Sequence, residues 1–273
     1  MTSSRQYKRI LTIAGSDSGG GAGIQADLKT IGALGGYGLS VITALTAQNT
    51  LGVKAIHAAP VDFVVAQLEA VFSDIGADAV KIGMLYSAEL IAAVAACLKR
   101  YQATNIVFDP VMLAQSGDRL LQDDAVDALK THLMPLAAVL TPNLPEAAAL
   151  SGMPVASLEE GRACARQLAV YGSHSILIKG GHLHTTDNCD DLLYLTSEDR
   201  FITLAGPRIQ TRNHHGTGCT LSSAIATFLA RGHAIADAVA AAKTYLTGAI
   251  AAAAAYQIGK GHGPVHHFYR YWD

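Results

Sequence analysis

The sequence predicts an α/β fold in which a mostly parallel sheet is covered by helices on both faces. Two observations lead to this prediction. Short apolar segments alternate along the chain with longer segments that have helical spacing. The short segments are almost continuously apolar, which is typical of strands buried on both faces. Half of the 273 residues are hydrophobic, so there is ample material for a core.

The elements expected in the first half of the chain follow this alternation. One of the predicted helices begins at Ser87, whose side-chain hydroxyl is suited to cap the helix N-terminus. Strands are expected at Ile10–Ala14, Leu39–Leu45, Ala79–Ile82 and Asn105–Met112. Helices are expected at Ala22–Leu34, Val61–Phe72 and Ser87–Tyr101.

The second half continues the pattern and ends in two alanine-rich helices. Strands are expected at Ala137–Leu140 and Ser175–Ile178, and an edge hairpin at Leu192–Leu195 and Phe201–Leu204. Helices are expected at Ser157–Tyr171, Cys219–Ala230 and Ala234–Tyr256. No linker, charge block or internal repeat divides the chain, so we expect a single domain over residues 1–273.

Charge and composition exclude several classes of function. The formal net charge is −2 and no run of Lys or Arg exceeds two residues, which argues against nucleic acid or an anionic membrane as the partner. No apolar stretch is long enough to cross a bilayer, and the polar segment Met1–Lys8 does not resemble a signal peptide. The four cysteines are widely spaced, which predicts a cytoplasmic protein with free thiols.

A glycine-rich turn that ends in a cysteine carries the strongest chemical signal. Gly216, Thr217 and Gly218 precede Cys219, and an apolar helix follows. A helix N-terminus has unpaired N–H groups and a positive dipole end, so it binds anions. The same field is expected to lower the pKa of Cys219, which would make it a base or nucleophile beside a transferred anion.

A second glycine-dense turn follows the first strand. Five glycines lie between Gly15 and Gly23, more than an ordinary strand-to-helix turn needs, so close approach of a ligand to the backbone is expected. The turn lacks the Gly-Lys-Ser/Thr ending of a Walker A loop and the distant acid of a dinucleotide fingerprint. An ordinary turn is the alternative.

Polar side chains follow several other predicted strands. Gln48 offers a donor and an acceptor that match an aminopyrimidine edge, although a surface position is the default for such a residue. Asp109, Asn143 and Glu146 could hold Mg²⁺, or Asn143 and Glu146 could form a capping box. Lys179 could neutralise a phosphate or be a solvated strand end. The histidines have no zinc-like spacing, and we expect them to form hydrogen bonds.

Taken in order, these motifs resemble one family over nearly the whole chain. They include the first strand with Gly15-Ser16-Asp17, the segments Lys81–Leu85, Asp109–Met112 and Thr141–Glu146, Lys179–His182, the turn His215–Thr220, and Gly263–His267. Together they are similar to the hydroxymethylpyrimidine/phosphomethylpyrimidine kinases of thiamine biosynthesis, in the ribokinase-like superfamily.

The resemblance implies a three-layer α/β/α sandwich and two successive phosphorylations, of a pyrimidine alcohol and then of its monophosphate, with ATP and Mg²⁺. It implies that Cys219 accepts the hydroxyl proton at a position where most ribokinase-like enzymes carry an aspartate, and that Gly216 and Gly218 cradle the phosphoryl group. Implied pyrimidine-pocket residues are Gln48, Gly15, Asp27 and Met84; implied nucleotide and metal residues are Lys179, Asn143, Asp109 and Glu146. It also implies a mobile flap at Leu113–Leu121 and a homodimer.

Three alternatives stay open. A pyridoxal/pyridoxine kinase shares the fold and the chemistry, but Gln48 and Asn49 after the second strand favour the pyrimidine. A covalent cysteine enzyme with His214 or His215 as base would leave Asp109, Glu146 and Lys179 without a role. A non-catalytic sensor of a vitamin precursor would need neither these residues nor Cys219.

Overall fold

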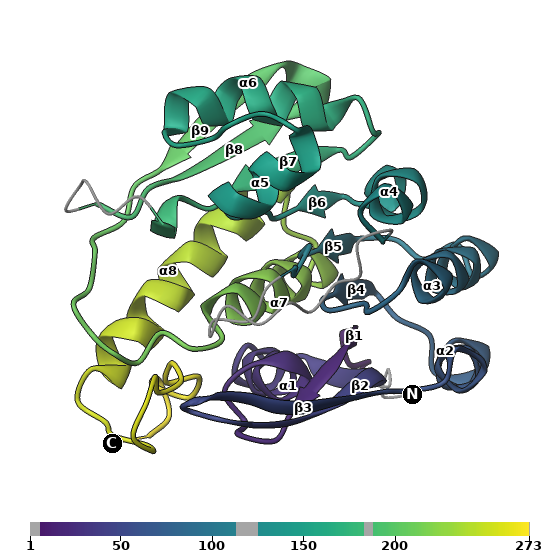
Figure 1. The fold of residues 1–273 in the computed structure, drawn as a ribbon, viewed down its shortest axis with the longest axis horizontal. Coiled ribbons are helices and arrows are strands. Elements are labelled where there is room, and N and C mark those ends of the chain that lie inside the picture. The colour runs from purple at the N-terminus through teal and green to yellow at the C-terminus, as the bar shows by residue number, and fades with distance from the viewer. Residues whose placement is uncertain (1–5, 113–124, 183–187, 273) are drawn as a thin grey trace, which may run out of the picture.

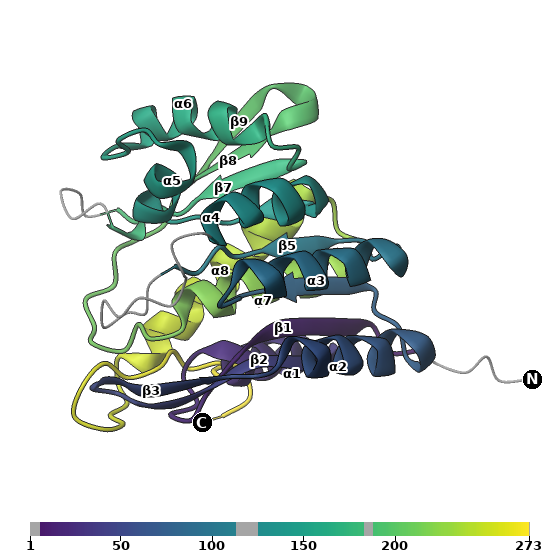
Figure 2. The same cartoon turned by 45° about the vertical axis from the view of Figure 1, so that its right-hand side comes forward.

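A mixed sheet of nine strands runs through the described residues, which are 6–112, 125–182 and 188–272 of this computed structural model. The spatial order is β3-β2-β1-β4-β5-β6-β7-β8-β9. Figure 2 shows the strands stacked from β3 near the bottom to β9 near the top. The strands are β1 (Arg9–Asp17), β2 (Tyr37–Asn49), β3 (Gly52–Ala58), β4 (Ala79–Ile82), β5 (Ile106–Phe108), β6 (Val139–Leu140), β7 (Ser175–Ile178), β8 (Asp191–Leu195) and β9 (Arg200–Leu204).

Helices connect and cover the strands. They are α1 (Gly23–Ala33), α2 (Val61–Asp74), α3 (Ala88–Arg100), α4 (Ala125–Ala128), α5 (Leu144–Ser151), α6 (Leu158–Ala169), α7 (Thr217–Ala230) and α8 (Ile235–Ala253). The segment after α4 continues as a π-helical turn and then a 3₁₀ turn, as far as Leu136.

Strands β2, β1, β4, β5, β6 and β7 are parallel to one another, whereas β3, β8 and β9 pair antiparallel at the two ends of the sheet. One face packs against α2 to α6, and the other packs against α1, α7 and α8. Figure 1 shows these helices on either side of the strands. The predicted three-layer α/β/α arrangement and the mostly parallel sheet are therefore confirmed.

Most of the predicted elements are present, but α4 and α5 were not among the predicted helices, and the sheet also differs. The edge hairpin is confirmed as β8 and β9. Strand β2 continues to Asn49, so Gln48 lies within it and not after it, while β5 is shorter than predicted. Strand β3 was missed because its side chains are largely exposed and carry little apolar signal. The predicted flap at Leu113–Leu121 lies outside the described residues.

The helix caps follow their local sequence. Ser87 accepts a hydrogen bond from the N–H of Leu90, and Ser157 accepts one from Glu160. Among the described residues, no helix combines the length and the apolar character that crossing a bilayer requires.

Candidate active site

Three charged side chains meet at the carboxyl edge of the parallel strands. Asp109 follows β5 and Lys179 follows β7, and the Lys179 ammonium lies 2.7 Å from Asp109 Oδ1. Glu146, in the first turn of α5 after β6, has Oε2 3.7 Å from the same ammonium. Ligands of open parallel sheets bind beyond this edge. The structure therefore brings together the three residues predicted to serve phosphates and metal.

Asn143 and Glu146 form a capping box at the start of α5. The Asn143 side-chain oxygen accepts from the Glu146 N–H at 2.8 Å, and Glu146 Oε2 accepts from the Asn143 N–H at 2.7 Å. The capping alternative is therefore confirmed. The nucleotide-binding role of Asn143 and the metal role of Glu146 stay predictions.

The cluster of Asp109, Glu146 and Lys179 contains two carboxyl groups and one ammonium. Two buried carboxylates share one ammonium, and burial, reinforced by Asp109 against the opposing effect of Lys179, raises the pKa of Glu146 to about 7. Oxygen ligands with excess negative charge are the donor set that Mg²⁺ prefers. Within the described residues no three carboxylates, histidines or cysteines gather as a complete metal site, so water and phosphate would supply the other ligands.

The predicted anion-binding turn lies beside this cluster. Gly216 is the N-cap of α7 and has φ of +79°, a conformation that favours glycine. A Cβ on Gly216 would also lie within 1.9 Å of the Gly21 carbonyl oxygen. A Cβ on Gly218 would lie 3.3 Å from Asp109 Oδ2 and 3.5 Å from Lys179 Nζ. The N-terminus of α7 therefore faces the Lys179–Asp109 pair, as an anion site requires.

A second helix N-terminus converges on the same point. Gly23, the first residue of α1, has φ of +56°, and a Cβ there would lie 2.3 Å from the Gly15 carbonyl oxygen. A hydrogen bond from the Gly23 N–H to the Cys219 sulfur favours the thiolate. Cys219, the third residue of α7, therefore lies between the starts of α1 and α7.

The expectation of a lowered pKa at Cys219 is wrong for this structure. Burial, reinforced by the carboxylates of Asp27 and Asp109 and opposed by Lys81, raises the pKa of its thiol to about 11. The helix N-terminus argument considered only local dipoles, whereas desolvation of the thiolate is the larger effect here.

Asp27 lies beneath the site, in a fully buried network. Its Oδ2 accepts from Thr12 at 2.6 Å and from Lys81 at 2.8 Å, and its Oδ1 accepts from Ser223 at 2.7 Å. Neither Asp27 nor Lys81 has an exposed side chain. These hydrogen bonds connect Asp27 of α1 with β1, β4 and α7 in the interior. Its contact with a pyrimidine stays a prediction.

Gly15 and Met84 are in contact, as their predicted place in one pocket wall requires. A Cβ on Gly15 would lie 2.6 Å from the Met84 terminal methyl carbon. Met84 packs with Ala44 of β2, and partly buried Val111 lies against them. Absence of a side chain at Gly15 therefore leaves room for the Met84 thioether at this wall.

Gln48 is half-buried, and its amide group lies near the glycine-rich turn that precedes Cys219. Its amide nitrogen is 3.3 Å from His215 Nε2, and His215 Nε2 is 2.9 Å from Asp17 Oδ2. His215 directly precedes Gly216. Gln48 therefore lies in a strand and not in a surface loop, and its side chain connects the end of β2 to the start of α7.

Two residues of this site, Lys81 and Asp17, were given no role from the sequence. A lysine inside an apolar strand at Lys81 is itself a signal, because a fully buried ammonium needs an anionic partner. Asp17 ends β1 and accepts from the N–H groups of Gly19, Gly21 and Ala22. An acid followed by glycines is a typical signal for such a turn.

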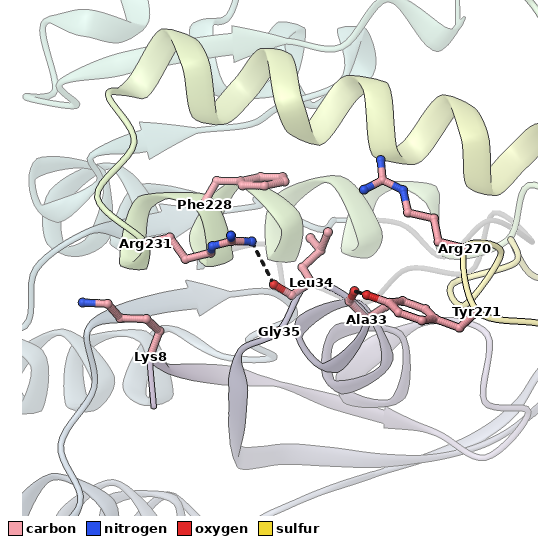
Figure 3. Close-up of a pocket in the computed structure, with 8 residues that line it drawn as sticks. All are labelled: Lys8, Ala33, Leu34, Gly35, Phe228, Arg231, Arg270 and Tyr271. Carbon is pink, nitrogen blue, oxygen red and sulfur yellow. Dashed lines mark hydrogen bonds between the residues drawn. The ribbon is translucent and has the colours of Figure 1, made fainter. Parts of the chain in front are cut away.

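A separate pocket of about 370 Å³ lies at the opposite ends of α1 and α7 (Figure 3). Arg231 donates to the Leu34 carbonyl at 3.1 Å, and the Tyr271 hydroxyl donates to the Ala33 carbonyl at 2.9 Å. These bonds satisfy carbonyls at the C-terminal end of α1 that have no partner within the helix. None of the predicted site residues lines this pocket.

Comparison with known proteins agrees with this geometry. Residues 17–266 match the family model described as phosphomethylpyrimidine kinase. A hydroxymethylpyrimidine/phosphomethylpyrimidine kinase of Rhizobium meliloti is 55% identical over 263 residues, covering 96% of this chain and 97% of that protein. The thiamine biosynthesis bifunctional protein ThiED of Geobacter sulfurreducens is 54% identical, and this chain spans 52% of its length.

Solved structures share the fold. Phosphomethylpyrimidine kinase from Clostridium difficile is 44% identical with a TM-score of 0.78, covering 89% of this chain and 99% of that one. Pyridoxal kinase from Staphylococcus aureus, in complex with AMP-PCP and pyridoxal, is 35% identical with a TM-score of 0.87, covering 97% and 94%. The family match spans most of the chain and includes every site residue described above except Thr12 and Gly15. The chain therefore belongs to the phosphomethylpyrimidine kinase family.

Proposed function

We propose that the protein transfers a phosphoryl group from ATP to 4-amino-5-hydroxymethyl-2-methylpyrimidine and then to the resulting monophosphate, in thiamine diphosphate biosynthesis. The observation that carries the proposal is the convergence of two helix N-termini on Cys219, opposite the Lys179–Asp109–Glu146 cluster. Such a site combines an anion cradle, a fixed cation and a proton acceptor. These are the parts that phosphoryl transfer requires.

Each residue has a defined task in this mechanism. Cys219 takes the proton of the substrate hydroxyl, the backbone N–H groups at Gly216 and Gly218 face the migrating phosphoryl oxygens, and Lys179 neutralises their charge. A thiol with a pKa of about 11 is protonated in most molecules at neutral pH, so the proton acceptor is the small fraction of Cys219 that carries a thiolate. The transition state of phosphoryl transfer is loose, so the proton can leave late and positioning contributes more than base strength.

Asp109 and Glu146 would hold Mg²⁺, since both carboxylates are buried and share a single ammonium. When bound, the ion supplies charge neutralisation on the nucleotide phosphates. Asn143 would serve the nucleotide from the start of α5.

The pyrimidine would lie between Gln48 and the wall formed by Gly15 and Met84, above the buried Asp27. The amide of Gln48 pairs with the amino group and the neighbouring ring nitrogen. This edge distinguishes an aminopyrimidine from pyridoxal, which has no amino group beside a ring nitrogen.

The test is a direct assay of purified protein with ATP and Mg²⁺ and either the aminopyrimidine alcohol or pyridoxal. ADP release and product mass identify the reaction. We expect successive addition of two phosphates to the pyrimidine, with a larger kcat/KM than for pyridoxal, and loss of activity in a chelator. Exclusive use of pyridoxal would refute the proposed substrate, and ligand binding without ATP consumption would favour a sensor.

A single domain over 1–273, a homodimer and a cytoplasmic location complete the proposal. Sedimentation at several protein concentrations tests the dimer.

A further inference from the structure

Three side chains form a continuous polar contact between the pyrimidine edge of the site and the catalytic turn. Asp17 ends β1, His215 precedes the N-cap of α7, and Gln48 lies near the end of β2. His215 Nε2 is 2.9 Å from Asp17 Oδ2, and the Gln48 amide group is 3.3 Å from the same nitrogen. The proposed function assigns a role only to Gln48.

The proton on His215 Nε2 follows from its partner. The Asp17 carboxylate accepts at Oδ1 from Gly19 and at Oδ2 from Gly21 and Ala22, so it acts as an acceptor throughout. Burial alone would raise the pKa of Asp17, but the hydrogen bonds from His215, Ala22 and Gly19 hold it below its usual value. An ionised carboxylate 2.9 Å away requires Nε2 to donate, whether the ring is neutral or charged.

The ring cannot easily turn away from this bond. A Cβ on Gly21 would lie 2.5 Å from His215 Cδ2, so the imidazole packs directly against the Gly21 backbone. The backbone N–H of His215 donates to the Gly263 carbonyl at 3.0 Å. His215 is therefore held from both its side chain and its main chain.

A donating Nε2 decides which end of the Gln48 amide faces it. The oxygen and nitrogen of an amide exchange places by a half-turn about the Cγ–Cδ bond, and only their partners tell them apart. Oxygen toward His215 can share the Nε2–H with Asp17, which stays its nearer acceptor, whereas nitrogen there would set two N–H donors 3.3 Å apart. The amide nitrogen then faces Thr46 Oγ1, which accepts from it and donates to the Ser16 carbonyl at 2.9 Å.

We propose that Asp17 and His215 are positioning residues that fix the orientation of the Gln48 amide, and so make the site specific for a ring with an amino group beside an unprotonated ring nitrogen. The inference rests on the proposed function. The hydroxymethyl group must point at Cys219, so the ring cannot turn over to fit a reversed amide. Amide orientation thus selects one order of donor and acceptor along the ring edge.

The test compares the aminopyrimidine alcohol with its 4-oxo analogue, in which donor and acceptor are exchanged along the same edge. The wild type should prefer the amino compound by about 100-fold in kcat/KM, since two hydrogen bonds are mispaired in the analogue. His215→Met removes the N–H donor at similar volume, and should reduce this preference to less than about tenfold. His215→Gln is the matched variant that keeps an N–H donor near the Nε2 position, and should retain the preference.

Equal preference ratios in the three proteins would overturn the inference, even if kcat fell in both variants, because a merely structural role lowers both substrates alike. Absence of turnover by the wild type on both compounds would instead overturn the proposed function. If His215→Met fails to fold, ¹⁵N NMR of histidine-labelled wild type decides. A proton on His215 Nε2, assigned by the signals lost in His215→Gln, supports the inference, and a bare Nε2 refutes it.

Discussion

Lys81 Nζ lies 2.8 Å from Asp27 Oδ2, and both side chains are completely buried beneath Cys219. Lys81→Met would leave the Asp27 carboxylate without its cation, and should lower the free energy of unfolding by about 3–5 kcal/mol. Urea denaturation measures the loss.

The exposed pair Arg100–Glu69 has the same 2.8 Å separation and provides the matched control. Arg100→Met should cost less than about 1 kcal/mol, since solvent screens this pair. The double variant Lys81→Met/Asp27→Leu should recover part of the stability lost in Lys81→Met. Equal costs for Lys81→Met and Arg100→Met would refute the account of the buried pair.

Cys219→Ala should lower kcat by about 10²–10⁴-fold with little change in the KM for the pyrimidine, because the thiol acts on a proton in the transition state. Steady-state kinetics measure both constants. Cys219→Asp restores a proton acceptor and should recover part of kcat. Full turnover by Cys219→Ala would exclude the thiol as base.

The pH dependence of thiol alkylation tests the environment of Cys219 independently of catalysis. A pKa of about 11 means that the thiol is protonated at neutral pH, so its alkylation by iodoacetamide should rise about tenfold per pH unit between pH 7 and 9. Peptide mass spectrometry follows this cysteine. A rate that is already level at pH 7 would contradict the burial effect.

Gly15→Ala should raise the KM for the pyrimidine by about tenfold and leave the KM for ATP unchanged. The added Cβ would lie 2.6 Å from the Met84 methyl, and this flexible side chain would move into the pocket. The control is Gly32→Ala in α1, where nothing lies within 4 Å of the added Cβ. Gly32→Ala should leave both KM values unchanged and stabilise the helix by about 0.5–1 kcal/mol.

The buried imidazole of His267 should make the stability of the folded protein depend on pH in the acidic range. Burial, reinforced by nearby Lys29 and His266, lowers the pKa of this imidazole to about 3. The unfolded chain therefore binds more protons between pH 6.5 and 3, so stability falls as pH falls through this range.

The effect of His267 on the free energy of unfolding should be on the order of 2 kcal/mol between pH 7 and 5. Urea titrations at the two pH values should show a steeper loss in the wild type than in His267→Gln. Exposed His57→Gln controls for the removal of a histidine as such. Identical pH slopes for the wild type and His267→Gln would be inconsistent with a buried neutral imidazole.

The layered fold could be predicted because buried strands and amphipathic helices leave strong local patterns. Ser87, Ser157 and Asn143 also mark helix starts through contacts three residues away. Strand β3 was not predicted because its own side chains are largely exposed, and it is held in the sheet by backbone hydrogen bonds to β2. The local sequence of β3 does not indicate that this segment pairs with β2.

The site residues could be predicted in part for a related reason. Asp109 and Lys179 follow strands whose carboxyl ends must meet, so their proximity is a consequence of topology. The pKa of Cys219 depends on burial among residues from three other segments, which no local pattern contains. The role of His215 depends likewise on Asp17, nearly two hundred positions earlier.

Helix α7 begins with the turn proposed to hold the phosphoryl group, and every residue from Thr220 to Ala230 is buried. The helix that bears Cys219 is thus an internal element of the protein and does not lie on its surface. It cannot fray or detach while the remainder stays folded. Loss of enzymatic competence in denaturant should therefore coincide with global unfolding, and no inactive but otherwise intact form should accumulate beforehand.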